Sequence, residues 1–221
     1  MGASTVSVFR DRRQAGEQLA EKLRGRGLDD PVVLALPRGG VPVASCIAAK
    51  LNAPLDIAVV RKIGAPHNPE AAIGAVTAEG DPLFDRGVLA WLRLEESDLA
   101  HMVATERAEA RRRVAAYRGD RPATRIEGRD AVVVDDGLAT GMSARAALTD
   151  LRDRRPASLT LAVPACSADA VRSLAGLCDA IVCLHTPGEF RAVSLWYEHF
   201  PQVSDDEVQH FLHQAAAGRP A

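Results

Sequence analysis

Short apolar runs alternate with helical segments along most of this chain, and this alternation restricts its fold more than any other feature. The apolar runs cover residues 32–36, 55–60, 131–134, 158–164 and 180–185. Helical periodicity predicts helices at about 10–26, 41–51, 143–154 and 167–177. Apolar strands that alternate with helices are typical of a parallel sheet covered on both faces. We therefore expect an α/β, Rossmann-like fold, with a parallel sheet of about five strands flanked by helices on both faces.

Two segments depart from the alternation. Residues 87–118 place apolar side chains on roughly one helical face: Leu92, Leu99, Val103, Ala110, Val114 and Tyr117. This pattern predicts a long helix or helix pair within a helical insertion at about 81–120, which we interpret as a lid or an oligomer contact. The sequence SDDE at 204–207 is a capping box, and it predicts a helix that ends near Ala217. We expect a single domain over 1–221 that includes this insertion and a C-terminal hood at about 186–217.

Charge and cysteine usage narrow the possible partners and the compartment. The formal net charge is only −2, which argues against a nucleic acid or an anionic membrane as a partner. No apolar run reaches the ~18 residues of a membrane span, and no signal-peptide pattern follows Met1. We expect a cytoplasmic protein whose cysteines are free, buried thiols, because none forms a C-x-x-C pair: Cys46, Cys166, Cys178 and Cys183.

Three polar, glycine-containing turns follow three of the predicted strands. PRGG follows the run at 32–36, RKIGAP follows the run at 55–60, and DDGLATGMS follows the run at 131–134. Ligands of parallel α/β sheets bind beyond the carboxyl ends of the strands. The three turns are therefore expected at one edge of the sheet, around the active site.

The turn DDGLATGMS, residues 135–143, combines three features that suit a sugar phosphate. Gly137 and Gly141 allow a tight turn and a close approach to a ligand. The segment 140–143 offers hydroxyls and amide hydrogens at the start of a helix, where a phosphate is favoured. Asp135 and Asp136 can accept hydrogen bonds from a vicinal diol, or bind Mg²⁺ directly or through water.

These residues resemble the phosphoribosyl-pyrophosphate (PRPP) loop of type I phosphoribosyltransferases. The resemblance implies that Asp135 and Asp136 contact the ribose hydroxyls and serve as the Mg²⁺ ligands. It also implies that the 5-phosphate is held by Ala139, Thr140, Gly141, Met142 and Ser143, and that Gly137 and Leu138 belong to the same substrate-binding loop.

Two other turns resemble loops of the same family. LPRGG at 36–40 is similar to the diphosphate loop, in which a peptide bond that is often cis exposes amides to the ligand, and the matching residues are Arg38, Gly39 and Gly40. The segment 61–76 occupies the place of the mobile loop, and Arg61 and Lys62 at its start would reach the diphosphate.

The stretches ALPRGGVPVA, VVRKIGAPHNPEAAIGAV and WYEHFPQVSDDEV resemble a bacterial branch described only as predicted phosphoribosyltransferases. That resemblance spans nearly the whole chain, but it implies no particular acceptor. Hypoxanthine–guanine enzymes carry an aspartate at the position of Ala139. A hypoxanthine or guanine substrate is therefore less expected, although adenine is not thereby established.

The implied function is Mg²⁺-assisted phosphoribosyl transfer between PRPP and an unknown nitrogenous acceptor, such as a purine or pyrimidine base, with release of diphosphate. The catalytic candidates are Asp135, Asp136, Arg61 and Lys62. We expect a homodimer active in nucleotide metabolism. The alternative is a non-catalytic regulatory protein that binds PRPP or a nucleotide, and the lack of a recognisable helix-turn-helix pattern mildly favours the enzyme.

Other interpretations concern single features. An acidic pair after a strand also occurs in receiver domains, where it belongs to the first strand, and such a pair can be a simple turn. The aromatic residues of WYEHF at 196–200 either pack in the core or at an interface, or they place Trp196 and Tyr197 as a platform for the acceptor base. A zinc site at His210 and His213 is not expected, whereas His67 could touch a ligand.

Overall fold

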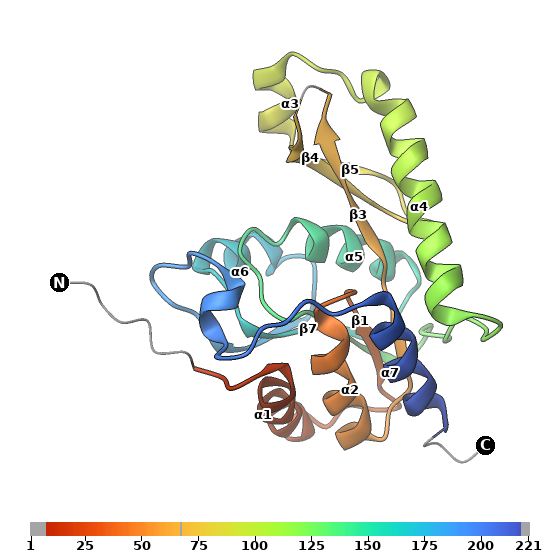
Figure 1. Cartoon of the computed structure of the whole chain (residues 1–221), viewed down its shortest axis with the longest axis vertical. Coiled ribbons are helices and arrows are strands. Elements are labelled where there is room, and N and C mark those ends of the chain that lie inside the picture. The colour runs from red at the N-terminus through yellow and green to blue at the C-terminus, as the bar shows by residue number, and fades with distance from the viewer. Residues whose placement is uncertain (1–7, 67, 218–221) are drawn as a thin grey trace.

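The body of the protein is built on a five-stranded parallel sheet with the strand order β2-β1-β6-β7-β8. The computed structural model describes residues 8–66 and 68–217 (Figure 1). The five strands follow the predicted apolar runs closely: β1 (Val32–Ala35), β2 (Leu55–Ile57), β6 (Asp130–Val134), β7 (Ser158–Ala165) and β8 (Ala180–His185). The expected α/β architecture is thus confirmed.

Helices cover both faces of this sheet because successive strand residues point to opposite sides. Val33 and Ala35 of β1 pack in one core with α1 (Arg12–Arg24), α2 (Gly40–Leu51) and α7 (Asp205–Ala217). Val32 and Leu34 pack in a second core with α5 (Met142–Asp153) and α6 (Ala168–Leu174). The apolar character of consecutive residues in β1 therefore follows from burial on both sides.

Residues 60–118 form an arm that projects away from the sheet of the body (Figure 1). The arm contains the antiparallel strands β3 (Val60–Ala65), β4 (Asn68–Thr77) and β5 (Leu83–Phe84). It also contains α3 (Arg86–Leu92), the 3₁₀ helix η1 (Glu96–Leu99) and α4 (Ala100–Arg118). A separate apolar core, which includes Ile63, Ile73 and Leu99, joins its strands to its helices.

Two expectations about the arm are wrong. Residues 61–76 were expected to be a mobile loop, but apart from the turn around His67, which lies outside the described residues, they belong to β3 and β4. The insertion expected at about 81–120 is also not purely helical, because it contains the short strand β5, which pairs with β4. The physical reason is that apolar side chains such as Ile63 and Ile73 are buried against the arm helices.

The predicted helical face over 87–118 is confirmed as a helix pair. Leu99, Val103, Ala110 and Tyr117 are buried, and the break between the helices falls at Arg93, which adopts a left-handed backbone conformation. The capping box at the C-terminal helix is also present. The Ser204 hydroxyl accepts a hydrogen bond from the Glu207 amide at 3.1 Å, and the Glu207 carboxylate accepts one from the Ser204 amide at 2.7 Å.

The cysteines are free thiols, as expected. Cys166 and Cys178 are buried, whereas Cys46 and Cys183 are partly buried. Burial raises the pKa of Cys166 to about 12, so this thiol stays protonated at neutral pH. Within the described residues, no helix is both long and apolar enough to cross a membrane.

Candidate functional site

The PRGG turn and the acidic loop meet at the carboxyl edge of the parallel sheet. Their strands, β1 and β6, are neighbours, and the Leu36 amide donates to the Val134 carbonyl at 2.8 Å. A Cβ atom added to Gly39 would overlap the Asp136 carboxylate, and one added to Gly40 would lie 2.6 Å from the Val134 carbonyl oxygen. The two glycines thus allow a close approach of the loops, and the peptide bond between Pro37 and Arg38 is cis.

The acidic pair is partly buried and therefore costly to ionise. Asp135 Oδ1 accepts a hydrogen bond from the Asp136 amide at 2.9 Å. Burial, followed by repulsion from Asp136, raises the pKa of Asp135 well above its usual range. Burial also raises the pKa of Asp136, although the Arg12 guanidinium acts in the opposite direction. A cation or a set of hydroxyl donors at this pair would relieve the cost of their charge.

Arg12 of α1 is a site residue that the sequence analysis did not identify. Its Nε lies 2.9 Å from Asp136 Oδ2, and only 9% of its side chain is exposed. Its Nη1 donates to the Pro201 carbonyl at 2.8 Å, and its guanidinium lies 3.7 Å from the centroid of the Phe200 ring. One signal was available: Arg12 shares a helical face with Ala15 and Leu19, where a charged side chain needs a partner.

The segment after the acidic pair has the features of an anion site. Gly141 has φ +77°, a left-handed conformation that favours glycine, and it immediately precedes α5. No side chain caps this helix, so its first amide hydrogens are left for a ligand or water. Ala139 and Thr140 are exposed, while Met142 and Ser143 are partly exposed.

Neighbouring strands fix the position of this segment. The Leu138 amide donates to the Ala165 carbonyl at 2.9 Å, and the Ser167 hydroxyl donates to the Ala139 carbonyl at 2.6 Å. Gly137 is also closely surrounded, because a Cβ added there would lie 2.7 Å from Val193 Cγ1. The loop is therefore held between the end of β7 and the hood.

The three predicted cations take different positions. Arg38 is exposed beside the acidic loop, with its Nη1 3.6 Å from Asp205 Oδ1. Arg61 lies on the arm, where its Nε donates to Glu106 of α4 at 2.8 Å. Lys62 is exposed on the same strand. Arg38 thus belongs to the turn that contacts the acidic loop through Gly39, although its guanidinium lies near α7, whereas Arg61 is paired within the arm.

The expectation that Tyr197 forms a platform for the acceptor base is wrong, because its ring is not open to solvent. Only 4% of Tyr197 is exposed, and its ring packs against Phe9 and Phe200. Its hydroxyl donates to the Asp136 backbone carbonyl at 2.6 Å. The other interpretation of this aromatic cluster, core packing, applies to Tyr197.

Trp196 is packed within the same hood. Its ring stacks with those of His185 and Phe190, at centroid distances of 5.9 and 6.0 Å. The ring remains partly exposed, so a contact with an acceptor stays a prediction for Trp196.

The side chains present are compatible with Mg²⁺ only in combination with a ligand. Within the described residues, no group of three or more His, Cys, Asp or Glu side chains could hold a metal ion. His210 and His213 therefore belong to no such group. Asp135 and Asp136 supply carboxylate oxygens, one of which is engaged by Arg12. This donor set fits Mg²⁺, which is commonly held by one or two carboxylates together with waters and substrate phosphates.

A groove of ≈540 Å³ lies apart from these loops, between α2 and α7. Its lining is largely apolar and includes Cys46, Ala49 and Phe211. None of the residues of the PRGG turn or the acidic loop lines this groove. The candidate site is thus defined by converging polar loops rather than by this cavity.

Comparisons with known proteins agree with this geometry. The family described as "Phosphoribosyl transferase domain" matches residues 9–179. Proteins from two strains of Mycobacterium tuberculosis, both named "Putative phosphoribosyl transferase", are 45% identical over 213 residues. That match covers 95% of this chain and 47% of each relative, so the chain spans about half the length of the curated relatives it matches.

Solved structures share the fold. The crystal structure of TT1426 from Thermus thermophilus is 43% identical, with a TM-score of 0.81, and the match covers 93% of this chain and 98% of that chain. A hypothetical protein from Neisseria gonorrhoeae with bound ppGpp is 14% identical, with a TM-score of 0.50 and coverage of 96% and 97%. The second likeness shows a common fold alone. Since the family match extends over most of the body and the whole arm, this chain belongs to the phosphoribosyl transferase domain family.

Proposed function

We propose that this protein transfers a phosphoribosyl group from PRPP to a nitrogenous acceptor and releases diphosphate. The observation that carries the proposal is the contact between Gly39 and Asp136. This contact joins a glycine turn that carries Arg38 to the carboxylate pair, and the uncapped N-terminus of α5 follows a few residues later in the same loop. A pentose that bears phosphates at both ends matches these three features together.

Each part of the ligand has a corresponding part of the site. The ribose hydroxyls would donate hydrogen bonds to Asp135 and Asp136. The 5-phosphate would accept hydrogen bonds from the amides and hydroxyls of residues 139–143, at the N-terminus of α5. The diphosphate would lie on the PRGG turn, where the Arg38 guanidinium offers a planar fork of donors.

Asp135 and Asp136 are the side chains that would hold Mg²⁺. When bound, the ion would offset the negative charge of the diphosphate. Because Arg12 already engages Asp136 Oδ2, Asp135 has the less compensated charge of the two. We therefore assign Asp135 the larger share in metal binding.

The reaction breaks the bond between ribose C1 and the diphosphate oxygen, and the electron pair leaves with the diphosphate. A nitrogen lone pair of the acceptor then forms the new bond to C1, and the proton of the acceptor nitrogen passes to water. Arg38 and the amides of Gly39 and Gly40 would stabilise the charge on the leaving diphosphate. The nearby carboxylates tolerate the positive charge that develops on the sugar.

The arm would supply further cations to the diphosphate. Arg61 and Lys62 are consecutive residues of β3, so their side chains point to opposite faces. Arg61 faces α4, where it pairs with Glu106. Lys62 therefore is the cation of the two that can reach a ligand without breaking an ion pair.

The acceptor remains open within the class of nitrogenous bases. Ala139 offers no carboxylate to a purine ring, so a 6-oxopurine is the less favoured choice. The free thiols fit a reducing compartment such as the cytoplasm, and a homodimer stays our expectation for the assembly.

The test is to incubate the protein with PRPP, Mg²⁺ and a panel of purine and pyrimidine bases, and to follow diphosphate release. Release that requires one base would support transfer. PRPP binding in calorimetry without release with any base would instead favour a regulatory binding protein. The variant with Asp135→Asn and Asp136→Asn is the control, because it keeps the side-chain shapes and should abolish Mg²⁺-dependent PRPP binding. Unchanged PRPP affinity in this variant would overturn the proposal.

A further inference from the structure

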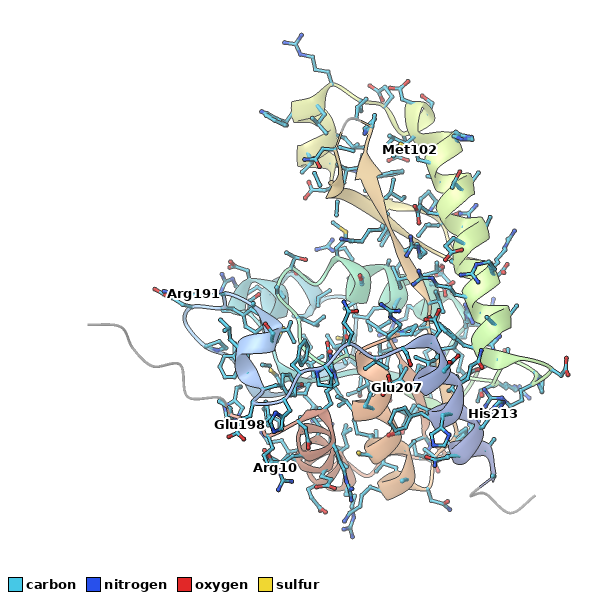
Figure 2. All side chains as sticks on the ribbon, viewed as in Figure 1. Arg10, Met102, Arg191, Glu198, Glu207 and His213 are labelled. Atoms are coloured by element: carbon cyan, nitrogen blue, oxygen red, sulfur yellow. The ribbon has the colours of Figure 1, made fainter. Side chains whose placement is uncertain are left out.

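Arg12 joins the acidic loop to two segments that are distant in sequence. Its guanidinium contacts the Asp136 carboxylate, the Pro201 carbonyl and the face of the Phe200 ring. The peptide segment around Pro201 is itself paired with the N-terminal segment, since the His199 amide donates to the Arg10 carbonyl at 2.8 Å. Figure 2 labels Arg10 and Glu198, which lie at this junction, next to the N-terminus of α1.

The burial of Arg12 distinguishes it from its neighbour in the same helix turn. Arg13 has a side chain that is 80% exposed, and it pairs with Glu17 one turn later. Arg12 has a side chain that is 9% exposed, and each of its contacts comes from outside α1. An arginine in the first turn of a helix gains nothing from the helix dipole, so these tertiary contacts must account for its position.

The two carboxylate oxygens of Asp136 differ in their contacts, because Arg12 binds only Oδ2. Oδ2 is engaged by Arg12 at 2.9 Å, and among residues 8–66 and 68–217 the only other side chain that hydrogen-bonds the carboxylate is the adjacent Asp135, so Oδ1 has no cationic partner. The backbone of Asp136 is fixed independently, because its carbonyl accepts the Tyr197 hydroxyl. The rotamer of the carboxylate thus depends on Arg12, whereas the main chain does not.

We propose that Arg12 is a positioning residue that holds the Asp136 carboxylate against repulsion from Asp135, so that Oδ1 is presented as the acceptor for a ribose hydroxyl. This inference rests on the proposed function of the loop. Without the guanidinium, two adjacent carboxylates would separate, and Asp136 would turn toward water. Arg12 acts through Asp136 and makes no contact with the ligand itself.

A double-mutant cycle on PRPP affinity tests this inference. The variants are Arg12→Met, Asp136→Asn and the combination of both, and the dissociation constant for PRPP is measured by calorimetry with Mg²⁺ present. We expect Arg12→Met to weaken binding about tenfold or more, because a charged hydrogen bond that orients the acceptor is lost. In the Asp136→Asn background the same change should alter affinity less than about twofold, because the group through which Arg12 acts is already neutral.

Two further variants control for folding and for charge. Arg13→Met removes a neighbouring exposed charge and should bind PRPP like the unmodified protein. Arg12→Lys keeps the positive charge but cannot hold both Asp136 and Pro201 with a fork of donors, so its affinity should lie between those of the unmodified protein and Arg12→Met. If Arg12→Met does not fold, as judged by thermal unfolding, the cycle is measured with Arg12→Lys instead.

The outcomes separate this inference from the proposed function. Additive effects of the two substitutions would show that Arg12 contributes only to the general stability of the hood, and would overturn the inference alone. Equal binding by Arg12→Met and Arg13→Met would do the same. Unchanged PRPP affinity in Asp136→Asn would overturn the proposed role of the loop itself, and the inference with it.

Discussion

Gly39 lies so close to Asp136 that the smallest side chain at position 39 would overlap the carboxylate. The contact joins two turns that follow neighbouring strands, β1 and β6. Any side chain at position 39 must therefore displace the Asp136 carboxylate or separate the turn that carries Arg38 from the acidic loop.

The substitution Gly39→Ala is accordingly expected to reduce PRPP affinity by about tenfold or more, because the two halves of the proposed ligand site move apart. Calorimetric titration with PRPP measures the effect. Gly176→Ala is the matched control, since a Cβ added there meets no atom within 4 Å, and it should leave affinity unchanged. Equal affinities for the two variants would contradict the proposed meeting of the turns.

Asp135→Asn is expected to stabilise the folded protein at neutral pH while it weakens PRPP binding. Burial and repulsion from Asp136 raise the pKa of Asp135, so the folded state holds this proton more tightly than the unfolded chain does. The contribution of this one carboxyl to stability is therefore fully present below the unfolded pKa of Asp and is lost as pH rises through the raised pKa of the folded state. The amide does not titrate, so the variant should melt a few degrees higher at pH 7, and the difference should shrink toward acid pH.

Thermal unfolding across a pH series measures this difference. Asp120→Asn provides the control, because Asp120 is exposed in the turn after α4 and its replacement should not change the pH profile. A variant Asp135→Asn that melts below the unmodified protein at pH 7 would show that the ionised carboxylate stabilises the fold, which contradicts a raised pKa for Asp135.

Lys62→Met and Arg61→Met are expected to differ in their effect on thermal stability. Loss of Lys62 should lower the rate of diphosphate release by about tenfold or more with little effect on the melting temperature, because the side chain is exposed and would act on the leaving group. Loss of Arg61 should also lower the melting temperature, because a partly buried ion pair with Glu106 is removed. Lys22→Met, at an exposed position of α1, is the control for a lost lysine charge. An unchanged rate in Lys62→Met would remove this residue from the catalytic set.

Tyr197→Phe is expected to cost about 1 kcal/mol in the free energy of unfolding, because a hydrogen bond to a partly buried carbonyl is lost while the ring packing is kept. The bond to the Asp136 carbonyl is 2.6 Å long, so PRPP affinity should fall as well. Tyr117→Phe is the matched comparison, since its hydroxyl donates to Asp205 at 2.6 Å, in a contact that joins α4 to α7. Denaturant unfolding should show a loss of stability for both, and the loss should be at least as large for Tyr117→Phe because its acceptor is a carboxylate. Unchanged PRPP affinity in Tyr197→Phe would contradict this prediction.

The strands of the body could be predicted because each contains a continuous run of mostly apolar residues, and the inner strands β1, β6 and β7 are buried on both faces. Residues 180–185, for example, form β8 with the predicted bounds. The hairpin of the arm could not be predicted in the same way. Gly64 and Pro66 interrupt the apolar positions of β3 and its turn, and a register shift at Gly64 breaks the regular alternation of side chains. These turn residues favoured a loop, whereas burial of Ile63 and Ile73 against the arm helices produced strands.

The loops of the candidate site could be identified from local sequence because glycines, carboxylates and hydroxyls follow one another within a few residues. The supports of those loops could not. Arg12 contacts Asp136 across a separation of 124 residues, and no local pattern records such a pairing. Tyr197 was recognised as part of an aromatic cluster, but its hydroxyl bond to the Asp136 carbonyl depends on the folding of the hood over α1.

The acidic loop has its restraints at opposite ends of the chain, near residue 12 and near residues 197–201. During translation the sheet strands β1, β2 and β6 can associate while the loop still lacks Tyr197 and Pro201. The contacts that hold the acidic loop are therefore completed late, only after residues up to 201 have left the ribosome. If the proposed function is correct, a chain that ends before these residues would form most of its sheet without being able to bind PRPP.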